Sequence, residues 1–366
     1  MGINLKDERE LLSKPGDTIV ETLEELKMSQ AELAERMGKT PSKINDIISG
    51  KEPISVSTAL QLEKVLDVDA QFWLNREMQY REKLSRLDQE EALEECKEWL
   101  NQQPIKELKR YGYIKSDKPG TAMVAEFLQF YGVATQVQWQ SIYVDQFASV
   151  DYRKSEKHQF AMGSIAAWLR IGEIEMRKLN IQEFHKDIMK DNLSTIKKLV
   201  RTHPEDFAER LQALCLDAGV ALVYTACISK APISGAARWV GGNPLIQLTD
   251  RYKSNDHFWF TFFHEIGHIF LHGKKEIFME EFEGYTLNQV KEIEANDFAV
   301  RWLLPEEFLK DLPDTITEKD IRIIARAYET HPAIVLSRLQ HKKLVPYSFG
   351  NTMKLKVVLN DLLANS

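Results

Sequence analysis

A strongly apolar stretch, residues 257–272, carries His264 and His268 four residues apart, with Glu265 directly after the first. Four residues are just over one helical turn, so on a helix both imidazoles project from one face and can share one ion. The rest of the stretch is largely apolar, with Phe258, Trp259, Phe262, Phe263, Ile266, Ile269, Phe270 and Leu271. A helix that is apolar on nearly every side is buried, and buried imidazoles are costly unless something pairs them. The chain must therefore build a substantial core around one histidine-bearing helix.

These residue types suit a catalytic zinc site. Neutral imidazoles are good Zn²⁺ ligands, and a catalytic site uses three protein ligands and leaves a fourth position to water. The ion lowers the pKa of that water, and a carboxylate beside it can take the proton and pass it to a leaving amine. The pattern therefore indicates peptide hydrolysis. The alternative is a chance pentapeptide whose histidines are hydrogen-bonded to backbone carbonyls.

The third ligand should come from the following helix, residues 291–304, which ends at Pro305. Glu292 and Glu294 lie two residues apart on it, about 200° around the helix, so only one of them can face the ion. Spacing alone does not choose between the two carboxylates.

The two blocks together resemble the ImmA/IrrE-type zinc metallopeptidases. The resemblance rests on the His264–His268 helix with its trailing His272, followed by Glu294-Ala295-Asn296, Phe298-Ala299 and Leu303-Leu304-Pro305. It implies zinc ligands His264, His268 and Glu294, with Glu265 as the general base. Trp302 departs from the family, which usually has a smaller residue there. His272 is about 12 Å along the helix from His264, too far to share the ion, so we expect a structural role for it.

Residues 17–66 divide into short helices with clear boundaries. Ser29 and Glu32 form a capping box that opens one helix, which ends at Gly38. Thr40-Pro41 caps the next, which runs to Ile48, and Ser57 opens another. Two short helices joined by a glycine-containing turn are what a helix-turn-helix requires.

This N-terminal region is similar to the HigA-like antitoxins of the lambda-repressor-type (XRE) helix-turn-helix class over some 70 residues. The resemblance rests on Lys14-Pro15-Gly16-Asp17, Gln30-Ala31-Glu32-Leu33-Ala34, Ser49-Gly50-Lys51 and Ala70-Gln71-Phe72-Trp73-Leu74. Members usually repress their own operon and neutralise a neighbouring toxin. With Ile44, Ile47 and Ile48 facing the core, we expect the DNA contacts at Gln30, Lys39, Thr40, Pro41, Ser42, Lys43, Asn45, Asp46, Ser49 and Lys51.

Charge supports this local assignment. The formal net charge of −7 excludes a chain that coats nucleic acid indiscriminately. Between Arg36 and Lys51, however, Asp46 is the only acidic residue beside four basic ones, so positive charge is concentrated where DNA would lie. The alternative is a helical bundle of the same shape that docks a protein instead of DNA.

The remaining chain predicts a multidomain protein. Residues 160–173 should pack in a core, with Arg170 and Glu173 able to pair, or else form a peptide-binding or regulatory surface. Beyond Pro204 we expect a helix at 207–216, strands at 219–224, 235–240 and 245–248, the zinc helix, and a closing helix at 355–363.

We therefore predict four regions. They are an all-α helix-turn-helix domain at residues 1–84, a helical connector at 85–203, an α+β zincin-like metallopeptidase domain at 204–345, and a C-terminal helical tail at 346–366. Three scattered cysteines lack metal-ligand spacing, and no apolar run is long enough to span a membrane. We expect a cytoplasmic location and no membrane partner.

These features predict a DNA-binding transcriptional regulator or antitoxin of a toxin–antitoxin-type operon, with a zinc-dependent endopeptidase domain that cleaves a specific regulatory protein. The alternative is an antitoxin and autorepressor only, with a structural or vestigial zinc site. Glu265 favours the first, because a vestigial site need not keep it. The expected partners are double-stranded operator DNA, a cognate toxin or repressor protein, and a second copy of the chain in a homodimer.

Overall fold

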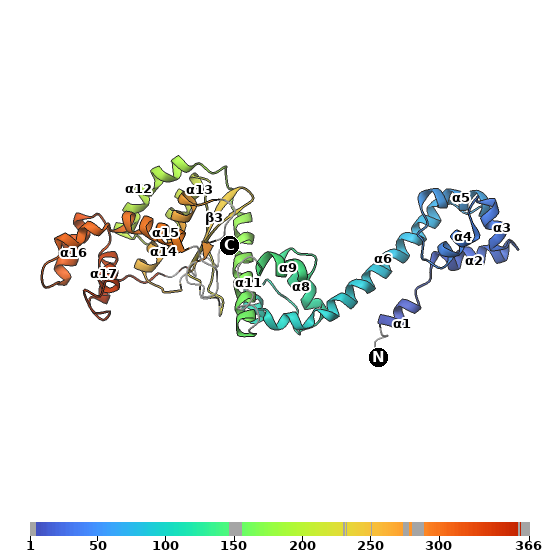
Figure 1. Ribbon diagram of the computed structural model, residues 1–366, viewed down its shortest axis with the longest axis horizontal. Coiled ribbons are helices and arrows are strands. Elements are labelled where there is room, and N and C mark those ends of the chain that lie inside the picture. The colour runs from blue at the N-terminus through green and yellow to red at the C-terminus, as the bar shows by residue number, and fades with distance from the viewer. Residues whose placement is uncertain are drawn as a thin grey trace. The chain divides into compact units, whose positions relative to one another are not determined.

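The computed structural model describes residues 5–145, 156–229, 231, 233–249, 251–273, 278–279, 289–357 and 359 (Figure 1). Its helices are α1 (Leu5–Glu10), α2 (Pro15–Glu25), α3 (Gln30–Arg36), α4 (Pro41–Ile48), α5 (Val56–Leu66), α6 (Ala70–Glu95), α7 (Ile105–Arg110), α8 (Thr121–Tyr131), α9 (Gln136–Tyr143), α11 (Glu156–Lys178), α12 (Lys186–Thr202), α13 (Phe207–Asp217), α14 (Asn255–Leu271), α15 (Gln289–Leu303), α16 (Glu318–Ala327) and α17 (Pro332–His341). Short 3-10 helices are η1 (Lys97–Gln102), η2 (Glu306–Asp311) and η3 (Asn351–Met353). The strands are β1 (Ala221–Tyr224), β2 (Gly235–Val240), β3 (Asn243–Leu248) and β4 (Phe278–Met279). These elements form two compact units, Met1–Glu98 with Lys118–Ala125, and Trp99–Asp117 with Glu126–Ser366.

In the first unit, α2 to α5 and the start of α6 enclose one apolar core. Leu23, Leu33, Ile44, Leu62 and Trp73 are among its buried members. Side-chain caps set the helix starts, because Ser29 Oγ accepts a hydrogen bond from the backbone N–H of Glu32 and Thr40 Oγ1 accepts one from that of Lys43. The predicted helix-turn-helix pair is thus α3 and α4. The helix predicted to open at Ser57 is α5, which begins one residue earlier, at Val56, because Ser55 caps it.

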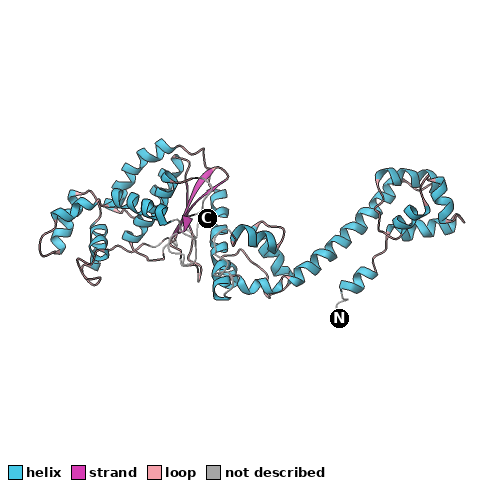
Figure 2. Cartoon of the chain, viewed as in Figure 1, coloured by secondary structure: helices cyan, strands magenta, loops and turns pink. Residues whose placement is uncertain are grey.

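In the second unit, a mixed sheet has the strand order β1-β3-β2-β4. Figure 2 distinguishes its strands, in magenta, from the surrounding helices. β1 pairs with β3 in parallel, while β2 pairs with β3 and β4 antiparallel. The strands predicted at 235–240 and 245–248 are confirmed, the second starting earlier, at Asn243. The turn between β2 and β3 consists of Gly241 and Gly242.

Both faces of this sheet are covered, so its strands are buried almost throughout. Leu222, Ile246 and Leu248 point into the large core formed with α12 to α17. Alternate positions point the other way, and Ala221, Val223 and Leu245 form a smaller cluster with Met176 of α11. α11 therefore covers one face while α14 packs on the opposite one (Figure 1).

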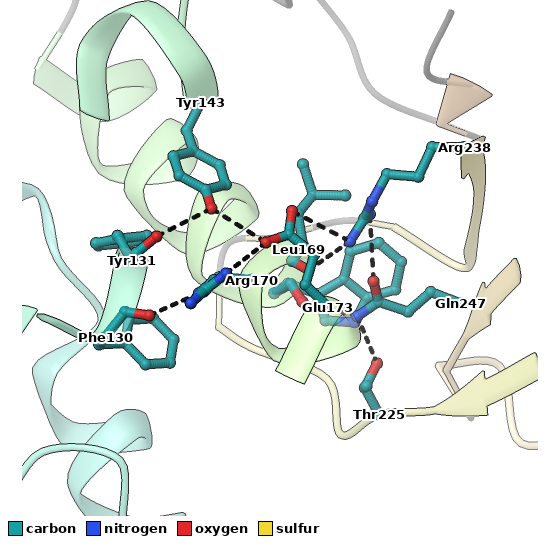
Figure 3. A network of polar contacts seen from close by, with 10 residues as sticks. Phe130, Tyr131, Tyr143, Leu169, Arg170, Glu173, Thr225, Arg238 and Gln247 are labelled. Atoms are coloured by element: carbon teal, nitrogen blue, oxygen red, sulfur yellow. Dashed lines mark hydrogen bonds and ion pairs between the residues drawn. The ribbon is translucent and has the colours of Figure 1, made fainter. Parts of the chain in front are cut away.

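A polar network ties α11 to the sheet and to α8 and α9 (Figure 3). Arg170 donates to the Phe130 carbonyl at 2.6 Å and pairs with Glu173 at 2.7 Å, which confirms the predicted pair. Arg238 of β2 donates to the Leu169 carbonyl, and its burial lowers the pKa of its guanidinium to about 10. Residues 161–171 are all buried, as the core-packing prediction requires.

The C-terminal part departs from one expectation. His331 caps α17 ahead of Pro332, because its Nδ1 accepts a hydrogen bond from the Ala333 backbone N–H at 3.1 Å. The predicted closing helix is wrong for Leu355–Val357, where Lys356 forms an antiparallel bridge with Ser254. A bridge beside the start of α14 satisfies this backbone without a helix. Residues 358 and 360–363 of that prediction lie outside the described residues.

None of the helices in the described part of the chain combines the length and apolar content needed to cross a bilayer.

The predicted domain boundary at residue 84 lies inside α6, which runs uninterrupted from Ala70 to Glu95.

We expect the free energy of unfolding of the chelator-treated protein to fall as the pH is lowered from about 6.5 towards 4. His203 Nδ1 accepts a hydrogen bond from the Trp259 indole N–H at 3.1 Å, and burial, with His331 nearby, lowers the pKa of His203 to about 4. Between the usual histidine pKa and about pH 4, His203 is therefore protonated in the unfolded chain but neutral in the folded chain. Urea unfolding at several pH values measures how the free energy of unfolding changes with pH. For this partly exposed ring the change should be less than about 1 kcal/mol per pH unit.

The matched variant is His203→Asn, which keeps an acceptor but does not titrate. His203 ends α12 with φ +41°, a conformation that asparagine tolerates. The variant should show a shallower loss of stability in acid. An identical slope in both proteins would assign the effect to other groups.

Candidate metal centre and DNA-binding face

The helix α14 carries the predicted histidines into the interior. Phe258, Trp259, Phe262, Phe263 and Ile266 are buried on it, which confirms that the helix is enclosed on nearly all sides. His264, Glu265 and His268 are exposed by only 2%, 0% and 1%. Three polar side chains at this depth must be satisfied by the protein or by an ion.

A second helix, α15, lies directly against α14. At Gly267 an added Cβ would lie 3.3 Å from the Cα of Ala295 and from the side chain of Phe298. The absence of a side chain at this position lets the two backbones approach closely. Their approach brings the carboxylate of Glu292, one turn before Asn296, to the histidine pair.

The donor atoms of His264, His268 and Glu292 converge. The two Nε2 atoms are 3.0 Å apart, and the Glu292 carboxylate oxygens lie 3.2 Å from His264 Nε2 and 3.5 Å from His268 Nε2. Bonds of 2.0–2.2 Å to a tetrahedral zinc ion place its ligand atoms about 3.3 Å apart. Two imidazoles and one carboxylate at these separations therefore suit a catalytic zinc site with one open position.

The structure places the third carboxylate differently from the family-based expectation. Glu294 is 54% exposed, and its carboxylate lies 3.7 Å from Nδ1 of His272, outside the cluster. Glu292 and Glu294 point about 200° apart around α15, and contact through Gly267 turns the Glu292 face towards α14. In this structure the carboxylate that joins the two histidines is therefore that of Glu292 and not the expected one of Glu294.

Asn296 is a functional candidate that sequence reasoning missed. Its Oδ1 accepts a hydrogen bond from Nδ1 of His264 at 3.0 Å, which leaves Nε2 of that ring unprotonated and directed at the cluster. The spacing could have indicated this residue, because Asn296 is four residues after Glu292 and lies on the same face of the helix.

Electrostatics keep the second imidazole neutral. Burial, together with His264, His272 and Lys291, lowers the pKa of His268 to about 2. Since a metal binds the neutral ring, His268 needs no deprotonation at physiological pH to act as a ligand.

The two remaining residues of the predicted motif have packing roles. His272 ends α14, and its ring contacts the Lys291 carbonyl of α15, with Nε2 3.1 Å from the oxygen, so it joins the two helices as expected of a structural residue. Trp302 stacks on Phe263 with ring centroids 6.1 Å apart. Its larger ring therefore fills core space between α14 and α15.

In the first unit, the structure leaves the predicted DNA-contact residues on the surface. Gln30, Thr40, Pro41, Ser42, Lys43, Asn45 and Lys51 are exposed, and Lys39, Asp46 and Ser49 are half-buried. Ile44 and Ile47 are buried on the opposite face of α4, and Ile48 packs at the core's edge. This one-sided exposure is the arrangement that a recognition helix needs.

The basic charge on this face is partly neutralised within the protein. Lys43 forms an ion pair with Glu52, and Arg36 pairs with Glu32 at 2.6 Å. Exposed pairs of this kind are weak, so a phosphate group can displace either carboxylate.

Comparisons with known proteins match both ends of the chain. A helix-turn-helix family model matches residues 19–73, and an IrrE N-terminal-like domain model of the M78 peptidases matches residues 221–340. The first match contains all the predicted DNA contacts, and the second contains the whole histidine and glutamate cluster.

Two relatives share part of the chain. The uncharacterized HTH-type transcriptional regulator YddM of Escherichia coli (strain K12) is 37% identical over 62 residues, which is 17% of this chain and 66% of that protein, just under two thirds of its length. Virulence-associated protein I of Dichelobacter nodosus is 34% identical over 77 residues, 21% of this chain and 71% of that protein. The chain therefore belongs to the XRE-type helix-turn-helix regulator family and carries a C-terminal ImmA/IrrE-like M78 peptidase domain.

Proposed function

We propose that this regulator is an antitoxin-like repressor whose C-terminal domain is a zinc-dependent endopeptidase that cleaves a specific regulatory protein of a toxin–antitoxin-type operon. The observation that carries the proposal is the convergence of two buried imidazoles and one carboxylate beside a second buried carboxylate, Glu265. A purely structural zinc site uses four protein ligands. Among the residues that the structure describes, three donors converge, which leaves a position for a reacting water.

The proposed ligands are His264, His268 and Glu292. A zinc ion held there supplies a Lewis acid and lowers the pKa of a water molecule. Asn296 fixes the tautomer of His264 and so directs its Nε2 lone pair at the site.

Glu265 is the proposed general base. Its carboxylate is fully buried, and β2 passes so close that a Cβ at Gly235 would lie 2.9 Å from Glu265 Oε1. The carboxylate takes a proton from the attacking water and delivers it to the leaving amine nitrogen, while the adjacent strand keeps bulk water from its other side.

The helix-turn-helix domain would bring this activity to an operator. We propose that α4 enters the major groove as part of a homodimer, with the ten surface residues named above contacting phosphates and base edges. A cognate toxin or repressor protein is then the partner or substrate, and its cleavage would change transcription of the operon.

The second candidate function is an antitoxin and autorepressor with a structural or vestigial metal site. It is favoured by the two relatives, whose matched segments make up 66% and 71% of their lengths. A regulator of this type therefore needs little beyond the shared segment. The two candidates differ in what they require of Glu265.

We expect the full-length chain to bind one zinc ion, and His264→Ala, His268→Ala and Glu292→Ala each to lose at least tenfold in zinc affinity. Glu294→Ala and His272→Ala should retain it, because neither residue contributes an atom to the cluster. Metal analysis after dialysis against a graded chelator measures the difference. Loss of zinc from the Glu294 variant with retention in the Glu292 variant would reverse our assignment.

Glu265→Gln should retain zinc, thermal stability and operator binding, yet lower the cleavage rate by at least about 10²-fold, because the amide keeps the volume but cannot accept the proton. In cells, the abundance of each protein encoded beside this gene is compared between the natural chain and the variant during induction. Glu294→Gln, a matched exposed change on α15, serves as the control. Identical protein levels and identical induction in all three strains would support the repressor-only function.

Lys43→Gln should weaken binding of operator DNA across sequences and lower the slope of log affinity against log salt by about 1, because one phosphate contact is lost. Lys83→Gln, an equal charge change on α6 outside the α3–α4 face, should leave both quantities unchanged. Fluorescence anisotropy at several salt concentrations measures them. Equal slopes for Lys43→Gln and the natural chain would show that α4 does not face the phosphates.

A further inference from the structure

A pocket with a volume of about 260 Å³ lies in the second unit, and none of its lining residues belongs to the candidate metal centre. The end of α12, the helix α16 and the start of α17 surround it. Its walls are formed by Arg201, Arg322, Ala325, Arg326, Thr330 and Pro332. Three of these six residues are arginines, and none is acidic.

The positive charge of this pocket is poorly compensated. Arg322 and Arg326 lie one turn apart on α16, and the described part of the chain places no carboxylate within ion-pair distance of either. Arg201 has Glu329 3.6 Å away, but both side chains are more than half exposed, so this pair contributes little. The charge of Arg322 also reaches His331, where it reinforces the lowering of the pKa that burial causes.

Thr330 forms part of the wall of the pocket without offering its hydroxyl to a ligand. The residue is 2% exposed, and its Oγ1 is fully buried. The polar groups that a ligand meets in this pocket are therefore those of the three arginines.

Helix electrostatics account for only part of this arrangement. Arg201 and Arg326 lie in the last turns of α12 and α16, where cations offset the negative end of a helix dipole. Arg322 lies in the middle of α16 and gains nothing from that effect. The helix ends therefore do not explain Arg322.

We propose that this pocket binds the phosphate group of a small phosphomonoester. The planar forks of three arginines match the several oxygens of a dianionic phosphate. Pockets for drug-sized ligands usually measure about 300–1,000 Å³, so this one suits a phosphate with a few carbon atoms better than a whole nucleotide. Such a ligand would bridge α12, α16 and the start of α17.

The test is titration of the full-length chain with inorganic phosphate and with glycerol phosphate, followed by calorimetry at constant ionic strength. The double variant Arg322→Gln/Arg326→Gln should bind both at least tenfold more weakly. Arg210→Gln removes an exposed arginine of α13 that pairs with Asp206 outside the pocket, and it should bind as the natural chain does.

Thr330→Val serves as a second control, because the hydroxyl that it removes is fully buried. This variant should bind phosphate as the natural chain does. An equal loss of affinity in this variant and in the double variant would indicate a change in the local fold and overturn the proposal.

Three further results would overturn the proposal. The first is binding of phosphate no tighter than that of chloride at the same ionic strength. The second is equal loss of affinity in Arg210→Gln and the double variant, which would indicate a general charge effect. The third is displacement of phosphate by a short non-operator DNA duplex that depends on Arg322 and Arg326, which would make this surface a DNA contact.

Discussion

The close packing of α15 on α14 is the contact on which the candidate metal centre depends. Gly267 leaves little space for a side chain, since an added Cβ would lie 3.3 Å from the Cα of Ala295, which is a tight contact. Inserting one methyl group into such a contact typically costs about 1–3 kcal/mol and displaces the partner. A shift of α15 would move Glu292 and Asn296 together, because both lie on the face that meets His264. One packing contact therefore fixes a ligand and the group that orients another ligand.

The burial of α14 explains why the sheet and several helices pack around it. The helix buries His264, Glu265 and His268 at 2% exposure or less, which requires apolar cover on every side. The sheet supplies one side through β2 and β3, while α15 and α17 supply others. The low dielectric that results keeps His268 neutral and strengthens the interaction of Glu265 with any proton donor beside it. Core packing and site chemistry are thus consequences of the same burial.

The sequence predicted the parts of this protein that depend on local pattern. The spacing of His264 and His268 and the serine and threonine caps each report a short-range physical preference, and each has its counterpart in the structure. The choice between Glu292 and Glu294 could not be made in this way. That choice depends on how α15 is rotated against α14, which is a tertiary contact that a local sequence pattern does not report. The extended segment at Leu355–Val357 was missed for a similar reason, because its bridge partner Ser254 is about a hundred residues away.

The region between the two matched domains is more than a connector. The M78 match begins at residue 221, yet one face of its sheet is covered by α11, which precedes the match. Without α11, Ala221, Val223 and Leu245 would face water, and the buried guanidinium of Arg238 would lose the Leu169 carbonyl that it contacts (Figure 3). The polar network therefore makes α11 part of the same folding unit as the metal-bearing helix, although nothing in the matched family pattern includes it.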